Sequence, residues 1–101
     1  MDLAIERDPD GTPVVVLTGE LDMATSSRLR ACLAVQDGPL VVDLADVTFL
    51  DSSALAVFNE IQLRLGGTLR LRDPSPFVRR VLAIAALDHW IEDGQPLPDP
   101  R

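Results

Sequence analysis

The sequence predicts one α/β domain, built on a mixed and mainly parallel sheet of about five strands packed with three to four helices. Two observations predict it. The chain has 101 residues, enough for a single core, and 47% are hydrophobic with only 4% aromatic, which suits an aliphatic core. After an opening hairpin, strand and helix patterns alternate along the chain, an order typical of parallel sheets with right-handed crossovers.

The hairpin comes first. Residues 3–7 form a short strand, and the turn Asp8-Pro9-Asp10-Gly11 follows, in which Pro fixes φ and Gly accepts a positive φ. Residues 13–18 form the second strand, whose run of three valines and a leucine is apolar on both faces, as in a central strand. We therefore expect the first strand to be the antiparallel edge of the sheet.

Helix and strand patterns then alternate, with capping and turn residues at their ends. We expect a helix over residues 24–35 capped by Asp22 or Thr25, a strand over 40–44, a helix over 53–65 ended by Gly66-Gly67, a strand over 68–72, a third helix with Ser75 as N-cap and Pro76 at its first position, and a last strand over 89–92. Residues 1–93 make up the domain, and residues 94–101, with three prolines, are expected to form a flexible tail.

Charge and composition exclude several functions. A net charge of −7 opposes binding to nucleic acid or to anionic membranes, and the absence of Lys removes the P-loop lysine and Schiff-base chemistry. No apolar run could span a membrane and no signal peptide is present, so we expect a cytoplasmic protein. The single cysteine, Cys32, agrees with a reducing compartment and is expected to be a small buried hydrophobe rather than a reactive thiol.

Polar groups are expected to converge at one edge of the sheet. In open α/β sheets, binding sites collect at the carboxyl ends of the parallel strands. Two loops fit that description, residues 18–22 and residues 45–53, and the second delivers Asp51-Ser52-Ser53 to the start of a helix. If their strands are neighbours, both loops lie on the same edge.

Ser52 has two interpretations that add to each other. Asp51 or a serine before an apolar helix is an N-cap, worth about 1 kcal/mol. A hydroxyl at a helix N-terminus also lies near a partial positive charge and free N–H groups, which stabilise an added phosphate. Ser52 is therefore placed to accept a phosphoryl group without unfolding the helix.

Other chemistry is less well supported. Glu20 and Asp22 are interpreted as a solvated turn with a capping aspartate; joined with Asp43 and Asp46 they would form a metal or phospho-aspartate site, but the latter needs a lysine. The motif around Ser52 lacks the G-x-S-x-G elbow of hydrolases. His89, the only histidine, is expected to be a partly buried structural residue in the last strand. We therefore predict no enzyme activity, no cofactor and no metal.

Two stretches resemble the STAS-domain anti-sigma-factor antagonists. They are VLTGELD (residues 16–22) and VVDLADVTFLDSSAL (residues 41–55), in this order and at this separation. The likeness covers nearly the whole chain and continues through residues 66–67 and 76–82. The resemblance implies a STAS-like fold and a binding protein that is switched by phosphorylation.

In that family, the first serine after the loop aspartate is phosphorylated by an anti-sigma factor that is a serine kinase, and here that serine is Ser52. The unphosphorylated antagonist binds the kinase and frees the sigma factor; the phosphorylated form releases the kinase until a phosphoserine phosphatase resets it. The expected partner-binding residues are Glu20, Asp22, Met23, Asp51, Ser52, Ser53 and Ala54.

One residue departs from the family pattern, and other functions stay open. Ala54 stands where the family usually has Gly, and its methyl group is expected to crowd a partner's backbone. Met23, Leu50 and Leu55 form either a partner patch or part of the core. The alternatives are a STAS subunit of a lipid-transport or stress-signalling assembly and, from a different class, an enzyme or nucleotide-binding domain on the same sheet.

Overall fold

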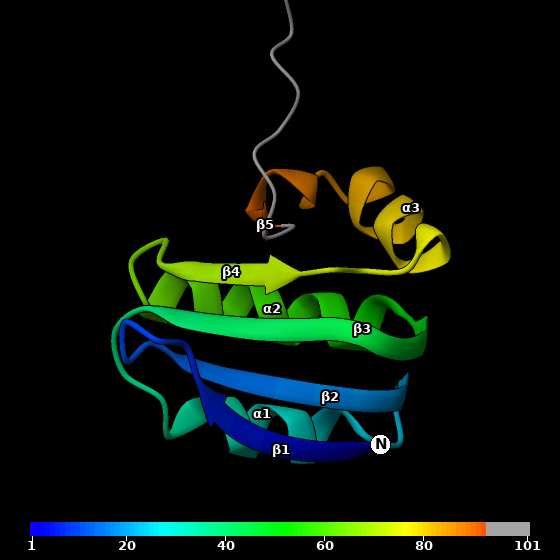
Figure 1. Ribbon diagram of the computed structural model, residues 1–101. Coiled ribbons are helices and arrows are strands. Elements are labelled where there is room, and N and C mark those ends of the chain that lie inside the picture. Colours follow the sequence, from blue (N-terminus) through cyan, green and yellow to red (C-terminus); the bar gives the residue numbers. More distant parts are fainter. Residues whose placement is uncertain (93–101) are drawn as a thin grey trace, which may run out of the picture.

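The structure is a computed structural model and describes residues 1–92. It contains a five-stranded sheet with three α-helices and one 3-10 helix (Figure 1). The elements, in chain order, are β1 (Asp2–Arg7), β2 (Pro13–Leu21), α1 (Ser26–Ala34), β3 (Leu40–Leu50), α2 (Ser52–Arg64), β4 (Leu69–Arg72), α3 (Pro76–Ile84), η1 (Asp88–Trp90) and β5 (Ile91–Glu92).

The strands lie in the sheet in the order β1-β2-β3-β4-β5. β1 pairs antiparallel with β2, and every later neighbouring pair is parallel. The expected α/β class, the mixed sheet and the antiparallel edge strand are thereby confirmed. The tail expected over residues 94–101 lies outside the described residues. No helix within residues 1–92 has the length and apolar character needed to cross a membrane.

The core lies between the sheet and its helices. α1 and α2 cover one face of the sheet in Figure 1. Alternate residues of β2, β3 and β4 point into this layer, where Phe58 of α2 is the largest fully buried side chain. Gln62 is the buried polar side chain of the core, and its amide exchanges two hydrogen bonds with the backbone of Leu69, at 2.8 and 2.9 Å.

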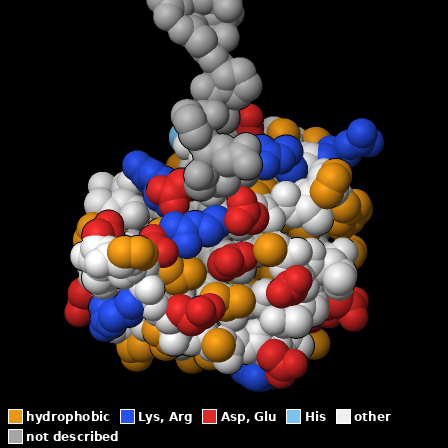
Figure 2. Space-filling model, in the orientation of Figure 1, with side chains coloured by type: hydrophobic (Ala, Val, Ile, Leu, Met, Phe, Trp, Pro, Cys, Tyr) orange, Lys and Arg blue, Asp and Glu red, His pale blue; other side chains and the backbone are white. Residues whose placement is uncertain are grey.

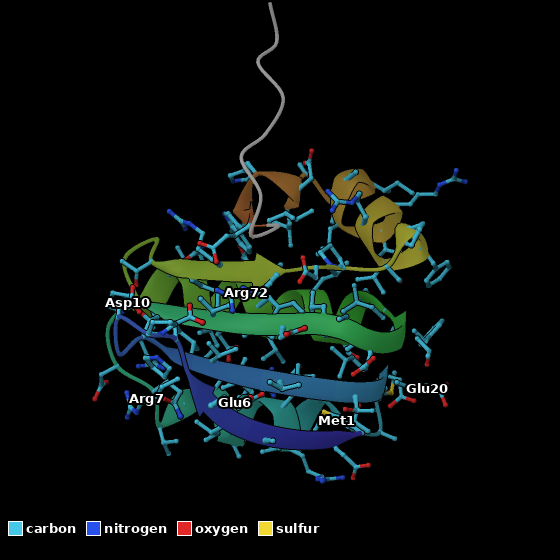
Figure 3. The ribbon with its side chains drawn as sticks, viewed as in Figure 1. Met1, Glu6, Arg7, Asp10, Glu20 and Arg72 are labelled. Carbon is cyan, nitrogen blue, oxygen red and sulfur yellow. The ribbon has the colours of Figure 1, made fainter. Side chains whose placement is uncertain are left out.

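The opposite face of the sheet carries charge. Figure 2 shows acidic side chains spread over it, and Figure 3 shows Arg72 and Glu6 on it. Arg72 donates two hydrogen bonds to the carboxylate of Asp8, at 2.7 and 3.0 Å, and one to Glu92 at 3.0 Å. The hydrogen bond from Arg72 lowers the pKa of Asp8, because it stabilises the ionised carboxylate. Arg72 thus joins the opening hairpin to β4 and β5.

β2 and β3 are longer than expected. The loops predicted over residues 18–22 and 45–53 are mostly strand, since β2 runs to Leu21 and β3 to Leu50. Two register shifts lie between Val16 and Thr18 and between Gly19 and Glu20. They let the strands stay paired, although their side chains no longer alternate strictly between the two faces of the sheet. Most residues of the two expected loops therefore belong to the ends of two bulged strands.

Expectations for the helices hold with small shifts. Ser75 caps α3 by accepting a hydrogen bond from the N–H of Val78 at 3.3 Å, as predicted, and Pro76 is the first helical residue. α1 begins two residues later than predicted, at Ser26, because residues 22–25 form a turn closed by the Thr25 N–H and the Asp22 carbonyl.

The last predicted strand is partly wrong. His89 and Trp90 belong to η1, and only Ile91–Glu92 pairs with β4. The chain must turn sharply from α3 back to the edge of the sheet, and a 3-10 turn makes this reversal in few residues. His89 is exposed rather than partly buried, with its ring edge-on to Trp90 at 5.5 Å between centroids. Cys32 is half-buried against the core, and burial raises the pKa of its thiol, in agreement with an unreactive side chain.

Candidate functional site

The carboxyl ends of β2 and β3 meet at one edge of the sheet, on the right in Figure 1. Leu21 and Leu50 pair where the two strands end, and both are buried. The N–H of Asp51 donates to the carbonyl of Leu21 at 3.1 Å, so the residue before α2 is fixed to the end of β2. Residues 20–25 and 49–53 thus form one continuous surface, which we call the rim. The predicted convergence of the two segments is confirmed.

Asp51 is the N-cap of α2. Its backbone is extended, and its carboxylate accepts hydrogen bonds from the N–H of Ser53 at 2.9 Å and of Ala54 at 3.4 Å. The hydroxyl of Ser53 donates to the same carboxylate. This hydroxyl contact lowers the pKa of Asp51 most, and the N–H groups of Ser53, Ala54 and Met23 lower it further, because all of them stabilise the ionised form. A carboxylate so occupied is a poor general base.

Ser52 is the first residue of α2, and its side chain is exposed. Among residues 1–92 its hydroxyl makes no hydrogen bond, in contrast to that of Ser53. The expectation of free N–H groups for a phosphate at this helix end needs correction, because Asp51 occupies those of Ser53 and Ala54. A phosphoryl group on Ser52 would therefore point into solvent beside an ionised carboxylate.

The loop between β2 and α1 is held by side chains. The carboxylate of Asp22 accepts from the N–H and the hydroxyl of Thr25, both at 3.1 Å, and the Asp22 N–H donates to the Thr25 hydroxyl oxygen at 2.9 Å. Thr25 is the N-cap residue of α1, but its side chain makes no capping bond to the helix. This turn leaves Met23 80% exposed on the rim.

Glu20 lies at the end of β2, where Figure 3 shows it at the edge of the sheet. Its side chain is exposed, and its carbonyl accepts from the Thr25 hydroxyl at 3.2 Å. Six of the seven expected partner-binding residues therefore lie on the rim, in the two segments that the hydrogen bonds described above hold together. The seventh is Ala54.

The expectation for Ala54 is wrong, and of the two alternatives left open for Leu50 the structure shows the core. Ala54 is completely buried under the first turn of α2, so its methyl group packs in the core and does not reach a partner. Leu50 is 2% exposed and also belongs to the core, because it faces the helices from the end of β3. Leu55 is half-buried, so of the suggested patch only Met23 is freely exposed.

The acidic residues near the rim do not assemble a metal site. Asp43 accepts a hydrogen bond from the N–H of Ala45 at 2.9 Å, and Asp46 is exposed opposite Thr18. Within the described part of the chain, no three His, Cys, Asp or Glu side chains are grouped so that they could hold a metal ion.

A cavity of about 300 Å³ lies at the opposite end of the sheet, near the starts of β3 and β4. Several of its polar side chains already have partners in the protein. Asp8 binds Arg72, Asp10 accepts from the N–H of Thr12, and Arg70 donates to the carbonyls of Gly67 and Leu69. The cavity is separate from the rim, and these three side chains are already engaged within the protein.

An aromatic pair beside the rim was not predicted from the sequence. Phe49, at the end of β3, and Phe77, in the first turn of α3, stack with centroids 6.2 Å apart and an interplanar angle of 22°. They are 39% and 50% exposed. The sequence offers no local signal for this pair, because Phe49 and Phe77 belong to different elements that meet only in the folded chain.

Comparisons with known proteins agree with this architecture. The family model described as "Mlab, STAS domain" matches residues 5–97. An anti-sigma F factor antagonist from Lysinibacillus sphaericus is 29% identical over 103 residues, covering 93% of this chain and 87% of that protein. An anti-sigma factor antagonist from Mycobacterium paratuberculosis has a similar structure, with a TM-score of 0.78, 28% identity, and coverage of 95% of this chain and 86% of the other.

The antagonist SpoIIAA has been solved in two forms, and both resemble this chain. The unphosphorylated form gives a TM-score of 0.75 at 26% identity, covering 93% of this chain and 89% of SpoIIAA. The phosphorylated form, from Bacillus, gives 0.69 at 25% identity, covering 93% and 92%. The strand order, the capped helix at the rim and the match over residues 5–97 together lead to one conclusion: the chain belongs to the STAS domain family.

Proposed function

We propose that this domain is an anti-sigma-factor antagonist that binds a serine-kinase anti-sigma factor through the rim, and that phosphorylation of Ser52 ends the binding. The observation that carries the proposal is the exposed Ser52 hydroxyl beside the occupied carboxylate of Asp51. Relatives and similar structures named as antagonists support the same function.

The geometry of the rim suits a site that a kinase modifies better than it suits a catalytic site. The Ser52 hydroxyl is accessible to a partner's active site, and the helix behind it is fixed by the Asp51 cap. Within residues 1–92 the carboxylate next to Ser52, that of Asp51, is engaged by Ser53 and Ala54 and is therefore poorly suited to act as a general base. We therefore assign the chemistry to the partner and the hydroxyl to this chain.

Phosphorylation of Ser52 is expected to release the partner through a local change in charge. A phosphoryl group adds about −1.5 to −2 charge at pH 7, next to Asp51 and close to the acidic residues of the rim. Inside a docked interface, an unmatched charge of this kind lowers affinity by a few kcal/mol, and about 3 kcal/mol is a hundredfold change. The similar TM-scores against the two forms of SpoIIAA support a switch without refolding.

The test is intact-mass analysis after incubation with ATP and each candidate kinase-type anti-sigma factor. We expect one phosphate on the wild type, none on Ser52→Ala, and one on the matched control Ser53→Ala, whose hydroxyl is bound to Asp51. Calorimetry with the same kinase should show affinity falling about a hundredfold on phosphorylation, and a phosphoserine phosphatase should restore it.

Other outcomes distinguish the alternatives. Phosphate on Ser52→Ala, or unchanged affinity after phosphorylation, contradicts the switch. If a kinase binds tightly but never phosphorylates Ser52, the domain acts as a constitutive antagonist of that kinase. If no anti-sigma factor binds, a role as the STAS subunit of a lipid-transport or stress-signalling assembly is favoured instead.

A further inference from the structure

Phe49 and Phe77 form an aromatic pair that the proposed switch at Ser52 does not use. Phe49 belongs to the rim segment of residues 49–53, and Phe77 reaches it from the first turn of α3, which begins at the same edge of the sheet in Figure 1. The rings stack with their centroids 6.2 Å apart, yet Phe49 remains 39% and Phe77 50% exposed. Two large apolar side chains are therefore left partly in water near the serine.

The pair is held in place before any partner binds. Val78, next to Phe77, is completely buried, and the Ser75 side chain caps the same turn of α3. Leu50, next to Phe49, is a core residue. Each ring is thus anchored by a buried neighbour and restrained by the other ring, so a partner that contacts the pair loses little side-chain entropy on binding.

A protein of ordinary interface size that docks on Ser52 also reaches Phe49. Three residues of chain span at most about 11 Å, which limits the distance between their Cα atoms. A standard interface occupies about 800 Å² on each partner, which corresponds to a patch with a radius of roughly 16 Å. The protein that covers the aromatic pair is then the same anti-sigma factor that phosphorylates Ser52, so the inference rests on the proposed function.

The surroundings of the pair indicate what this partner presents. Glu20 lies opposite Phe49 in the pairing of β2 with β3, and its side chain is exposed, as is that of Asp46 on β3. On the other side, Arg80 is exposed one helical turn after Phe77 on α3. An aromatic centre edged by solvated charged groups is typical of a binding hot spot. Its complement is an apolar pocket with basic side chains at the border that faces the sheet.

We propose that the Phe49–Phe77 pair is the apolar anchor of the interface with the anti-sigma factor, and that it sets the affinity without taking part in phosphoryl transfer. The cap that positions Ser52 at the start of α2 is formed by Asp51 and involves neither ring. Removing a ring therefore weakens the complex but leaves the serine in place. For the kinase reaction this predicts a higher KM with an unchanged kcat.

Calorimetry and phosphorylation kinetics test the anchor, with the candidate anti-sigma factor that binds the wild type as the probe. Phe49→Ala and Phe77→Ala should each lower the affinity at least roughly tenfold. Both should raise KM by a similar factor, while kcat changes less than about twofold. The matched control Leu63→Ala removes a 78% exposed apolar side chain from the end of α2 remote from Ser52 and should leave affinity and KM unchanged. Phe77→Tyr, which keeps the ring, should retain the affinity of the wild type.

A second measurement leaves the protein unmutated and so does not depend on the folding of a variant. The chain has three phenylalanines, and the third, Phe58, is fully buried in the core. In protein labelled with fluorophenylalanine, the fluorine signals of Phe49 and Phe77 should respond to replacing H2O by D2O in the free domain and lose this response in the complex. The signal of Phe58 is the internal control and should show no response in either state.

The outcomes separate the anchor from the switch. If the alanine variants are folded by circular dichroism and bind as tightly as the wild type, or if the solvent response of both surface rings persists in the complex, the pair only holds α3 against β3. The anchor is then overturned, while phosphorylation of Ser52 stands. If no candidate anti-sigma factor binds the wild type, the proposed function fails and the anchor fails with it.

Discussion

The N–H of Asp51 donates to the carbonyl of Leu21 at 3.1 Å, and this bond joins the end of β2 to the cap of α2. Asp51 therefore has two tasks. Its backbone closes the rim, and its carboxylate caps the helix that begins with Ser52. The residue next to the proposed phosphorylation site is thus part of the structure that holds that site in place.

Replacing Asp51 by Ala should destabilise the fold. The variant loses the acceptor for the N–H groups of Ser53 and Ala54, and loss of an N-cap lowers the free energy of unfolding by about 1 kcal/mol. Urea denaturation measures the change. Ser52→Ala is the control, because its side chain is exposed and unbonded, and it should stay within about 0.5 kcal/mol of wild type. Equal losses in both variants would contradict the assigned cap.

The cap also predicts a dependence of stability on pH. The folded pKa of Asp51 is lowered, chiefly by the Ser53 hydroxyl, so its contribution is present above the unfolded pKa of about 3.9 and is lost as pH falls through the lower folded pKa. The pKa of Asp8 is also lowered, chiefly by its hydrogen bond to Arg72, so Asp8 likewise contributes stability that is lost as pH falls. Urea midpoints measured from pH 7 to pH 3 should fall, and they should fall less in Asp51→Asn. An identical pH profile for the variant would exclude the contribution of Asp51.

Gln62 is expected to be the most sensitive polar residue of the core. Gln62→Leu would leave the N–H and the carbonyl of Leu69 unsatisfied in the interior, and each buried unpaired group costs about 1–3 kcal/mol. We expect a loss of roughly 2–4 kcal/mol in the free energy of unfolding, measured with urea. Leu63→Gln, one residue away on the exposed side of α2, should change stability by less than about 0.5 kcal/mol. If Gln62→Leu left the free energy of unfolding unchanged, water would be hydrogen-bonding to Leu69 in place of the amide.

Ala54→Gly tests whether the alanine at the family's usual glycine position affects stability or partner binding. Since Ala54 is buried in the first turn of α2, glycine removes a packed methyl group and lowers helix propensity, together worth about 1–2 kcal/mol. The affinity for the kinase found by the phosphorylation experiment should change less than twofold, about 0.4 kcal/mol. A variant of unchanged stability but clearly altered affinity would place position 54 in the interface after all.

The fold class was predictable because its signals are local. The turn Asp8-Pro9-Asp10-Gly11, the valine run of β2 and the Ser75-Pro76 cap each specify backbone geometry within a few residues. The candidate Ser52 was also accessible from the sequence, since Asp51 lies directly before an apolar helical pattern. The resemblance of residues 16–22 and 41–55 to the antagonists gave the same family that the comparison over residues 5–97 shows.

The tertiary structure decided which side chains near Ser52 are exposed and which are buried. Ala54 and Leu50 are buried, Phe49 stacks on Phe77, and the N–H groups behind Ser52 are occupied by Asp51. None of these follows from local pattern, because each depends on contacts between segments far apart in the chain or on competition for the same donors. The sequence by itself determined most of the elements, their order and the position of Ser52 at a helix start. The packing of β2 against β3, with its two register shifts, determined how far the strands extend and which residues the rim exposes.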